Sequence, residues 1–223
     1  MNVSGFQEKQ LQKLVTVFLE ENTKTNLSAL RDEKSVWNKH ILDALSASQY
    51  LEGTEPKRIL DIGTGGGFPL LPLALCFPQS QFFGMDSVRK KMDAISRMTS
   101  ALHIHNVDIL VGRMEEFGRN PKHREQYDVV TARAVAPFAV TAELASPFLK
   151  TGGLFLAYRG PEWSTADEQI ASLLNIKCIQ KKEYSLPEGE KRILWIFEKR
   201  GKTPNRFPRE VGTPKKKPLS TNG

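Results

Sequence analysis

The residues best suited to chemistry lie in a glycine-rich turn. The segment Leu60-Asp-Ile-Gly-Thr-Gly-Gly-Gly-Phe-Pro69 runs from an apolar, β-rich stretch into glycines and then into a stretch of helical character. Glycines let the backbone approach a ligand closely, as nucleotide-like cofactors require. Two ligand classes compete for such a turn. Dinucleotides favour the pattern G-x-G-x-x-G, whereas S-adenosylmethionine favours G-x-G-x-G preceded by an acid.

The spacing of the glycines separates these two classes. Gly63, Gly65 and Gly67 fit the shorter pattern. The longer pattern requires a glycine where Phe68 or Leu70 stands. The turn therefore favours S-adenosylmethionine, and a nicotinamide oxidoreductase is the less favoured reading.

Two acids follow the turn at places where a cofactor needs hydrogen-bond acceptors. Asp86 ends the second predicted strand, beside the glycine turn at the carboxyl edge of the sheet, which suits the hydroxyl groups of a ribose. After the third predicted strand, Met114 and Glu115 stand where an adenine ring would be packed and hydrogen-bonded. Glu115 taken alone is more typical of a surface charge than of a ligand.

The methyl acceptor is expected beside the fourth strand, which leads into Thr131-Ala-Arg-Ala-Val-Ala-Pro137. The sequence lacks the [ND]-P-P-[YFW] motif, which disfavours methylation of an exocyclic amine. No cysteine lies near the ends of the fourth and fifth strands, which disfavours the covalent route to carbon-5 of a pyrimidine. A ring nitrogen remains by elimination. Guanine N7 has an exposed lone pair, so positioning alone suffices, and no catalytic base is expected.

These residues need an alternating α/β framework to bring them together. Two amphipathic helices are predicted over residues 5–22, including Phe6, and 34–50. Short strands then alternate with helices, and a final hairpin turns at Pro187-Glu-Gly189. This order predicts a mostly parallel sheet of seven strands with helices on both faces, a Rossmann-like α/β fold. The expected strands cover residues 58–62, 81–86, 107–111, 127–131, 153–157, 177–184 and 191–198, and the helices between them cover residues 69–77, 88–102 and 138–149.

The positive charge is concentrated at the C-terminus. The chain has 223 residues and a net charge of +7, and residues 200–223 hold seven basic side chains against Glu210 alone. Six net charges therefore lie in this Pro- and Lys-rich segment, which we interpret as an extended tail. Such a tail suits a polyanion, because contacts with phosphates release counterions. A solubilising terminus and a strap packed on the domain are the alternatives.

The composition and the remaining residues exclude several classes. Hydrophobic residues make up 39% of the chain, as in a globular protein, and no apolar stretch is long enough to span a membrane. Cys76 and Cys178 form no CxxC pair, so we interpret both as reduced core thiols. His103 and His105 lack further ligands nearby, so no metal site is expected. We expect a cytoplasmic protein and a monomer.

Several segments taken in order resemble the bacterial 16S rRNA guanine-N7 methyltransferase family known as RsmG or GidB, over nearly the whole chain. They are Thr25-Asn-Leu-Ser-Ala-Leu-Arg-Asp32, His40-Ile-Leu-Asp43, Asp61 to Pro69, Asp86-Ser87, Arg133-Ala-Val-Ala136 and Gly212-Thr-Pro-Lys-Lys-Lys-Pro-Leu219. Leu70, Lys91 and Arg159 depart from the residues common in that family.

The resemblance implies a methyltransferase that uses S-adenosylmethionine and acts on 16S rRNA or the small ribosomal subunit. The expected cofactor-binding residues are Gly63, Gly65, Phe68, Asp86, Met114, Glu115 and Arg133. The expected substrate-binding residues are Arg113, Arg159, Lys215, Lys216 and Lys217. A helical extension (1–55), a methyltransferase core (56–200) and a basic tail (201–223) are predicted. The alternative function is a non-catalytic rRNA-binding module that retains the fold.

Overall fold

A single seven-stranded sheet organises the protein. The computed structural model describes residues 4–53 and 57–220. The strands lie in the order β3-β2-β1-β4-β5-β7-β6, and β7 runs antiparallel between β5 and β6 while the first five are parallel. They are β1 (Arg58–Ile62), β2 (Gln81–Asp86), β3 (Val107–Val111), β4 (Tyr127–Arg133), β5 (Leu149–Tyr158), β6 (Ile176–Ser185) and β7 (Lys191–Lys199). The predicted Rossmann-like fold is confirmed.

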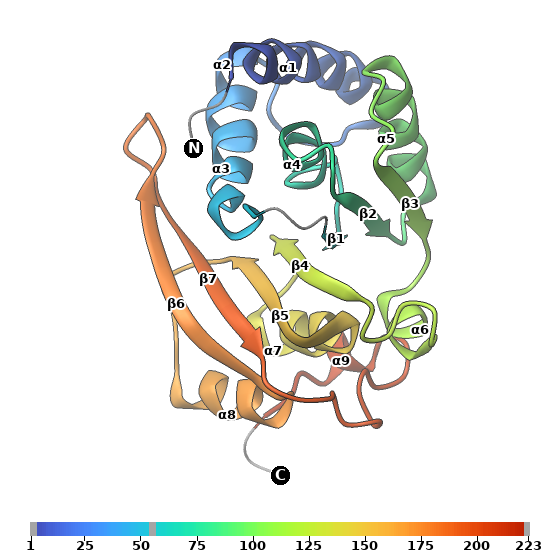
Figure 1. The fold of residues 1–223 in the computed structure, drawn as a ribbon, viewed down its shortest axis with the longest axis vertical. Coiled ribbons are helices and arrows are strands. Elements are labelled where there is room, and N and C mark those ends of the chain that lie inside the picture. The colour runs from blue at the N-terminus through green and yellow to red at the C-terminus, as the bar shows by residue number, and fades with distance from the viewer. Residues whose placement is uncertain (1–3, 54–56, 221–223) are drawn as a thin grey trace.

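Helices cover both faces of the sheet because the strand residues alternate between two cores. Ile59 belongs to one buried cluster and the next residue, Leu60, to the other. The first cluster packs under α1 (Gly5–Thr25), α4 (Leu70–Cys76) and α5 (Arg89–Ala101). The second packs under α6 (Met114–Arg119), α7 (Phe138–Ala145), the short 3₁₀ helix η3 (Ser146–Phe148) and α8 (Thr165–Leu173). Figure 1 shows α1, α4 and α5 grouped apart from α7 and α8. None of the described helices is both long and apolar enough to cross a membrane.

The N-terminal helices carry a local irregularity where they face the sheet edge. α1 begins with a capping box formed by Ser4 and Gln7. The second predicted helix is divided into α2 (Glu33–Val36), a π-helical turn η1 (Trp37–Ile41), α3 (Leu42–Leu45) and a 3₁₀ turn η2 (Ser48–Tyr50). A π turn inside a helix is frequent at functional sites. This one holds Lys39 and His40, and it lies between α2 and α3, which Figure 1 shows between α1 and the β6–β7 hairpin.

Some local expectations were wrong. Phe6 is 72% exposed and does not join the buried face of α1. Cys178 is only partly buried, unlike Cys76. The helices α6, α8 and α9 (Thr213–Lys216) were not predicted, because they are short and their apolar residues are few. The hairpin was predicted correctly, with its turn at residues 186–190.

The segment after Gly201 is predicted to be an extended tail, but it contains the short helix α9 and does not extend away from the protein. We call residues 203–213 the C-terminal strap. Phe207 is 3% exposed in the second core cluster. Arg209 pairs with Glu143 of α7, with 2.7 Å between Nη2 and Oε2. The interpretation as an extended tail is therefore wrong for this part. The proline and lysine content suggested an extended chain, but the buried ring of Phe207 and the ion pair of Arg209 hold the segment against the domain.

Candidate active site

The glycine turn is built for close contact at the carboxyl edge of β1. Gly63, Gly65 and Gly67 all have positive φ, the left-handed region that favours glycine. A Cβ at Gly63 would stand 2.8 Å from a methyl group of Val135. The N–H groups of Gly63 and Thr64 donate to the carbonyl of Met85, which ties the turn to β2. The turn is thus held open as a backbone surface on which a ligand can lie.

Asp86 lies against this turn, as predicted. Its Oδ2 accepts a hydrogen bond of 3.1 Å from the N–H of Gly65, and its Oδ1 accepts one of 2.9 Å from the N–H of Val88. An ionised carboxylate has about four acceptor positions, so Asp86 retains capacity for hydroxyl groups. It lines a cavity of about 340 Å³ together with Gly63, Gly65, Phe68, Lys91 and Arg133, among others. Five of the seven expected cofactor residues, Asp86 among them, therefore line one cavity.

Asp61 is a second acid at the turn, and it is not among the predicted site residues. It is 1% exposed, and its Oδ1 accepts a hydrogen bond of 2.7 Å from the hydroxyl of Thr131. Its Oδ2 is buried and has no hydrogen-bond partner within residues 4–53 and 57–220. Burial raises the pKa of this carboxyl to about 6. The signal was present in the sequence, because an acid before the turn is part of the shorter glycine pattern.

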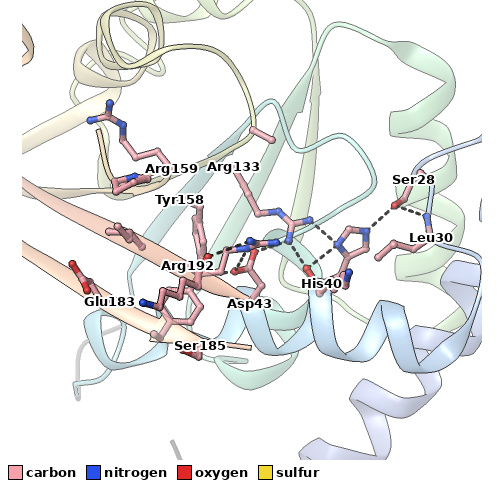
Figure 2. Close-up of a pocket in the computed structure, with 18 residues that line it drawn as sticks. Ser28, Leu30, His40, Asp43, Arg133, Tyr158, Arg159, Glu183, Ser185 and Arg192 are labelled. Carbon is pink, nitrogen blue, oxygen red and sulfur yellow. Dashed lines mark hydrogen bonds and ion pairs between the residues drawn. The ribbon is translucent and has the colours of Figure 1, made fainter. Parts of the chain in front are cut away.

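Arg133 at the end of β4 is the centre of a polar network shown in Figure 2. Its Nη1 donates to Oδ2 of Asp43 at 3.0 Å and to the carbonyl of Lys39 at 3.2 Å. Its Nη2 lies 3.1 Å from Nδ1 of His40. Burial, together with the charge of Arg133, lowers the pKa of His40 to about 4. A neutral His40 can accept from Arg133 at Nδ1 and donate from Nε2 to the hydroxyl of Ser28, 2.9 Å away.

Asp43 connects this network to the hairpin. The hydroxyl of Tyr184 in β6 donates to its Oδ1 at 2.6 Å, and Nε of Arg192 in β7 lies 3.9 Å from the same oxygen. The hydroxyl of Tyr158 at the end of β5 donates to the carbonyl of Ala44. These side chains line a cavity of about 930 Å³ between the N-terminal helices and the hairpin. We call it the acceptor cavity. The resembling segment His40 to Asp43 was a signal for this region, but no role was assigned to either residue.

The acceptor cavity and the cofactor cavity meet at the end of β4. Arg133 and Ala134 line both, as do Ser28 and His40. Ala134 has a φ of 54°, which is uncommon for a residue with a Cβ. A ligand lying on the glycine turn would therefore face a second ligand in the larger cavity, with the side chain of Arg133 between them.

The residues expected around an adenine ring lie partly outside these cavities. The terminal methyl group of Met114 would be 3.4 Å from a Cβ at Gly63, so Met114 reaches the glycine turn. Glu115 is 4% exposed, and its Oε1 accepts from the N–H of Gly212 at 2.8 Å and lies 3.3 Å from Nη2 of Arg113. The carboxylate of Glu115 is thus bound to the C-terminal strap, whose position the sequence did not indicate.

The expected substrate residues do not gather in one place. Arg113 lies at the start of α6 beside Glu115 and lines none of these cavities. Arg159 lines the acceptor cavity at the end of β5. The lysines of the C-terminal segment are exposed in and after α9, which packs against α7 rather than beside the acceptor cavity. Arg159 therefore lines the cavity, whereas α9, labelled in Figure 1, packs against α7 over the second core cluster and not against the N-terminal helices.

The sheet order, the glycine turn and the acid at the end of β2 define a Rossmann-like, S-adenosylmethionine-dependent methyltransferase fold. The structure of the O-methyltransferase TomG from Streptomyces achromogenes, in complex with SAM, is similar with a TM-score of 0.57 at 15% identity, over 85% of this chain and 90% of that one. A family model described as rRNA small subunit methyltransferase G matches residues 7–194.

Two curated relatives named ribosomal RNA small subunit methyltransferase G support the same assignment. The protein from Streptococcus pyogenes serotype M12 is 38% identical over 225 aligned residues, covering 98% of this chain and 94% of the relative. The protein from Lysinibacillus sphaericus is 38% identical with the same coverage. The chain belongs to the rRNA small subunit methyltransferase G family, GidB.

Proposed function

We propose that this protein transfers a methyl group from S-adenosylmethionine to N7 of a guanine in 16S rRNA. The observation that carries the proposal is the meeting of the two cavities at Arg133 and Ala134. A cofactor on the glycine turn would present its sulfonium methyl group toward the acceptor cavity. The family supports ribosomal RNA of the small subunit as the substrate class.

The reaction needs positioning rather than a proton acceptor. The lone pair of N7 forms a bond to the methyl carbon while the bond from that carbon to sulfur breaks, and its electron pair stays on sulfur. No proton leaves the base. This agrees with the hydrogen bonding at the junction, where Asp43 and His40 both contact the guanidinium of Arg133. Catalysis by orientation alone fits such a site.

The charge of Arg133 is the main electrostatic difficulty for this product. Methylation at N7 leaves a positive charge on guanine, which a free guanidinium beside the ring would oppose. Asp43 pairs with that guanidinium at 3.0 Å and largely balances its charge. The remaining donors of Arg133 can serve an anion, either the carboxylate of the cofactor or an RNA phosphate.

The residue roles within this proposal are those that the sequence predicts. We assign the cofactor to Gly63, Gly65, Phe68, Asp86, Met114, Glu115 and Arg133. We assign RNA contacts to Arg113, Arg159 and Lys215 to Lys217, and we propose that the protein acts as a cytoplasmic monomer on 16S rRNA or the small subunit.

The decisive experiment uses labelled S-adenosylmethionine and small ribosomal subunits at several stages of assembly, followed by nucleoside analysis of the rRNA. We expect label in 7-methylguanosine. Label in another nucleoside would refute the assignment to N7, and RNA binding without any label would favour the non-catalytic rRNA-binding module.

Cofactor use is tested separately by calorimetry. Asp86→Ala should weaken binding of S-adenosylmethionine by about 1–3 kcal/mol, since hydrogen bonds to the ribose are lost. The wild type should not bind NAD comparably. Because Asp86 also holds the N–H of Gly65, the unfolding temperature of the variant is measured alongside. An unchanged dissociation constant would remove Asp86 from the site.

A further inference from the structure

Arg159 follows β5 and lies on the side of the sheet edge opposite to Arg133. Arg133 is paired in register with Tyr158, and successive residues of a strand point to opposite faces. The hydroxyl of Tyr158 donates to the carbonyl of Ala44 in α3, so Tyr158 points toward the N-terminal helices. In Figure 2 the guanidinium of Arg159 points away from Arg133 and Asp43. The guanidinium groups of the two arginines therefore have different neighbours, although both residues line the acceptor cavity.

Three aromatic rings surround the guanidinium of Arg159. Its central carbon lies 4.9 Å from the ring centre of Phe138, 5.5 Å from that of Trp195 and 5.7 Å from that of Trp163. The two tryptophan rings are stacked, with centres 5.1 Å apart. The indole N–H of Trp195 donates to the carbonyl of Gly160, which fixes the chain just after Arg159. The guanidinium is thus held in place by packing.

Few acceptors reach this guanidinium. Oδ2 of Asp167 is 3.8 Å from Nη2, a long contact, and that oxygen already accepts from the N–H and the hydroxyl of Ser164 at the start of α8. Nη1 is buried with no hydrogen-bond partner among the described residues. Burial also lowers the pKa of Arg159. A buried donor without an acceptor is costly and calls for an explanation, of which a missing ligand is one.

A third cavity, of about 750 Å³, is lined in part by Arg159. It shares Ala134, Tyr158, Arg159 and Gly160 with the acceptor cavity, so the two adjoin along the end of β5. Its wall is largely apolar and aromatic, and it includes Val135, Pro137, Phe138, Ala139 and Trp163. We call it the side cavity.

We propose that the side cavity binds an unpaired nucleobase of the RNA, next to the acceptor nucleotide, with Arg159 donating to acceptor atoms on the edge of that base. Single-stranded RNA is read by stacking splayed bases on aromatic or guanidinium planes and by hydrogen bonds to their edges. A phosphate fits less well, because Glu162 and Asp167 also line the cavity and outnumber the one positive charge. This proposal rests on the proposed function only in taking RNA as the molecule that supplies the base.

Nuclear magnetic resonance can test the base site without any turnover. The probe is guanosine 5′-monophosphate at millimolar concentration, and the observed signals are the ¹⁵N-labelled indole groups of Trp163 and Trp195, assigned with Trp→Phe variants. Ribose 5-phosphate is the matched probe without a base. Trp37, which lies in η1 and not in the side cavity, is the internal reference. We expect the nucleotide to shift Trp163 and Trp195, and ribose 5-phosphate to leave them unchanged.

The variant Arg159→Met removes the donors and keeps an unbranched apolar stem against the rings. We expect it to abolish these shifts and to lower methyl transfer at low subunit concentration about tenfold, with a smaller loss at saturating subunits. Lys181→Met is the control, because Nζ of Lys181 also lies over the ring of Trp195, at 5.5 Å, outside the side-cavity wall. Unfolding temperatures show whether both variants fold.

Three results would overturn the inference. Equal shifts with ribose 5-phosphate would indicate a phosphate site instead. An absence of shifts with either probe, or shifts that persist in Arg159→Met, would also contradict it. If the wild type transfers no methyl group to small subunits, the proposed function fails while the resonance result still decides the base site.

Discussion

Two carboxylate–arginine pairs join the terminal segments to the α/β core, and they are built differently. In the first, Asp43 of the N-terminal helices pairs with Arg133 of β4. In the second, Arg209 of the C-terminal strap pairs with Glu143 of α7, and Glu143 is 0% exposed. Arg209 gives Glu143 three contacts from its side chain and one from its backbone N–H, at 2.7–3.1 Å.

The difference lies in what else each pair touches. Asp43 and Arg133 share their hydrogen bonds with His40 and Tyr184 and line the acceptor cavity. Glu143 and Arg209 bind each other on both carboxylate oxygens and line none of the three cavities described above. A pair in which both carboxylate oxygens are bound, and which lines none of these cavities, stabilises the fold. A pair with shared partners beside a cavity is available to a ligand, so its loss should affect chemistry more than stability.

The largest expected effect is on stability, at the second pair. Arg209→Ala leaves the buried carboxylate of Glu143 without its charged partner and with only the backbone N–H of residue 209, which should cost about 3–5 kcal/mol of unfolding free energy. For a chain of this length the melting temperature should fall on the order of 10 °C. Lys202→Ala, which removes one exposed charge from the same terminal segment, is the matched control in thermal and urea unfolding.

The activity of Arg209→Ala decides whether the comparison holds. Methyl transfer measured well below the melting temperature should stay within a few-fold of wild type. A loss of turnover as large as that expected for Asp43→Asn would show that the strap also affects the active site. The hydrogen bond from the N–H of Gly212 to Glu115 would then be the connection between them.

The next effect is on chemistry, at the first pair. Asp43→Asn keeps the volume of the side chain but leaves the charge of Arg133 unbalanced. Loss of charge-assisted hydrogen bonds worth about 1.5–3 kcal/mol should lower methyl transfer about 10–100-fold. Initial rates at varied cofactor and subunit concentrations measure it, with Asp108→Asn at an exposed position of β3 as control. A fall in melting temperature without a fall in rate would make this pair structural too.

A smaller effect concerns pH and isolates His40. Its folded pKa of about 4 lies below the ordinary value of 6.5, so the unfolded chain binds more protons between these values. The wild type should therefore lose stability relative to His40→Gln as the pH falls from 6.5 toward 4. Because the ring is only partly buried, we expect roughly 1–2 kcal/mol.

Unfolding by urea at several pH values gives this difference. Asp61 titrates in both proteins, and its raised pKa acts in the opposite direction, so only the difference between wild type and variant reports on His40. The exposed His103→Gln is the matched variant. The same pH trend in both histidine variants would contradict a special role for His40.

The sequence predicted the framework well and the connections between distant segments poorly. The strands, the glycine turn and Asp86 could be predicted because their signals are local: apolar runs, glycine spacing and a strand-end acid. The partners of Arg133 and Glu115 could not, because Asp43 is 90 residues away from Arg133, and Gly212 is 97 residues away from Glu115. The division at residues 55 and 200 stays a prediction.

The smallest expected effect on stability separates the two parts of the C-terminal segment. The strap up to residue 213 is fixed through Phe207 and Arg209, whereas Lys215, Lys216 and Lys217 are exposed. Changing all three lysines to alanine should leave the melting temperature within about 1 °C, because surface substitutions change stability by about 0.5 kcal/mol or less. If all three contact phosphates, the slope of log K for RNA against log salt should become shallower by roughly 2–3. Binding titrations at several salt concentrations measure it, and Arg209→Ala, compared at a temperature where it is folded, should keep the wild-type slope. A slope unchanged by the lysine substitutions would limit the C-terminal segment to the strap, with no part in holding RNA.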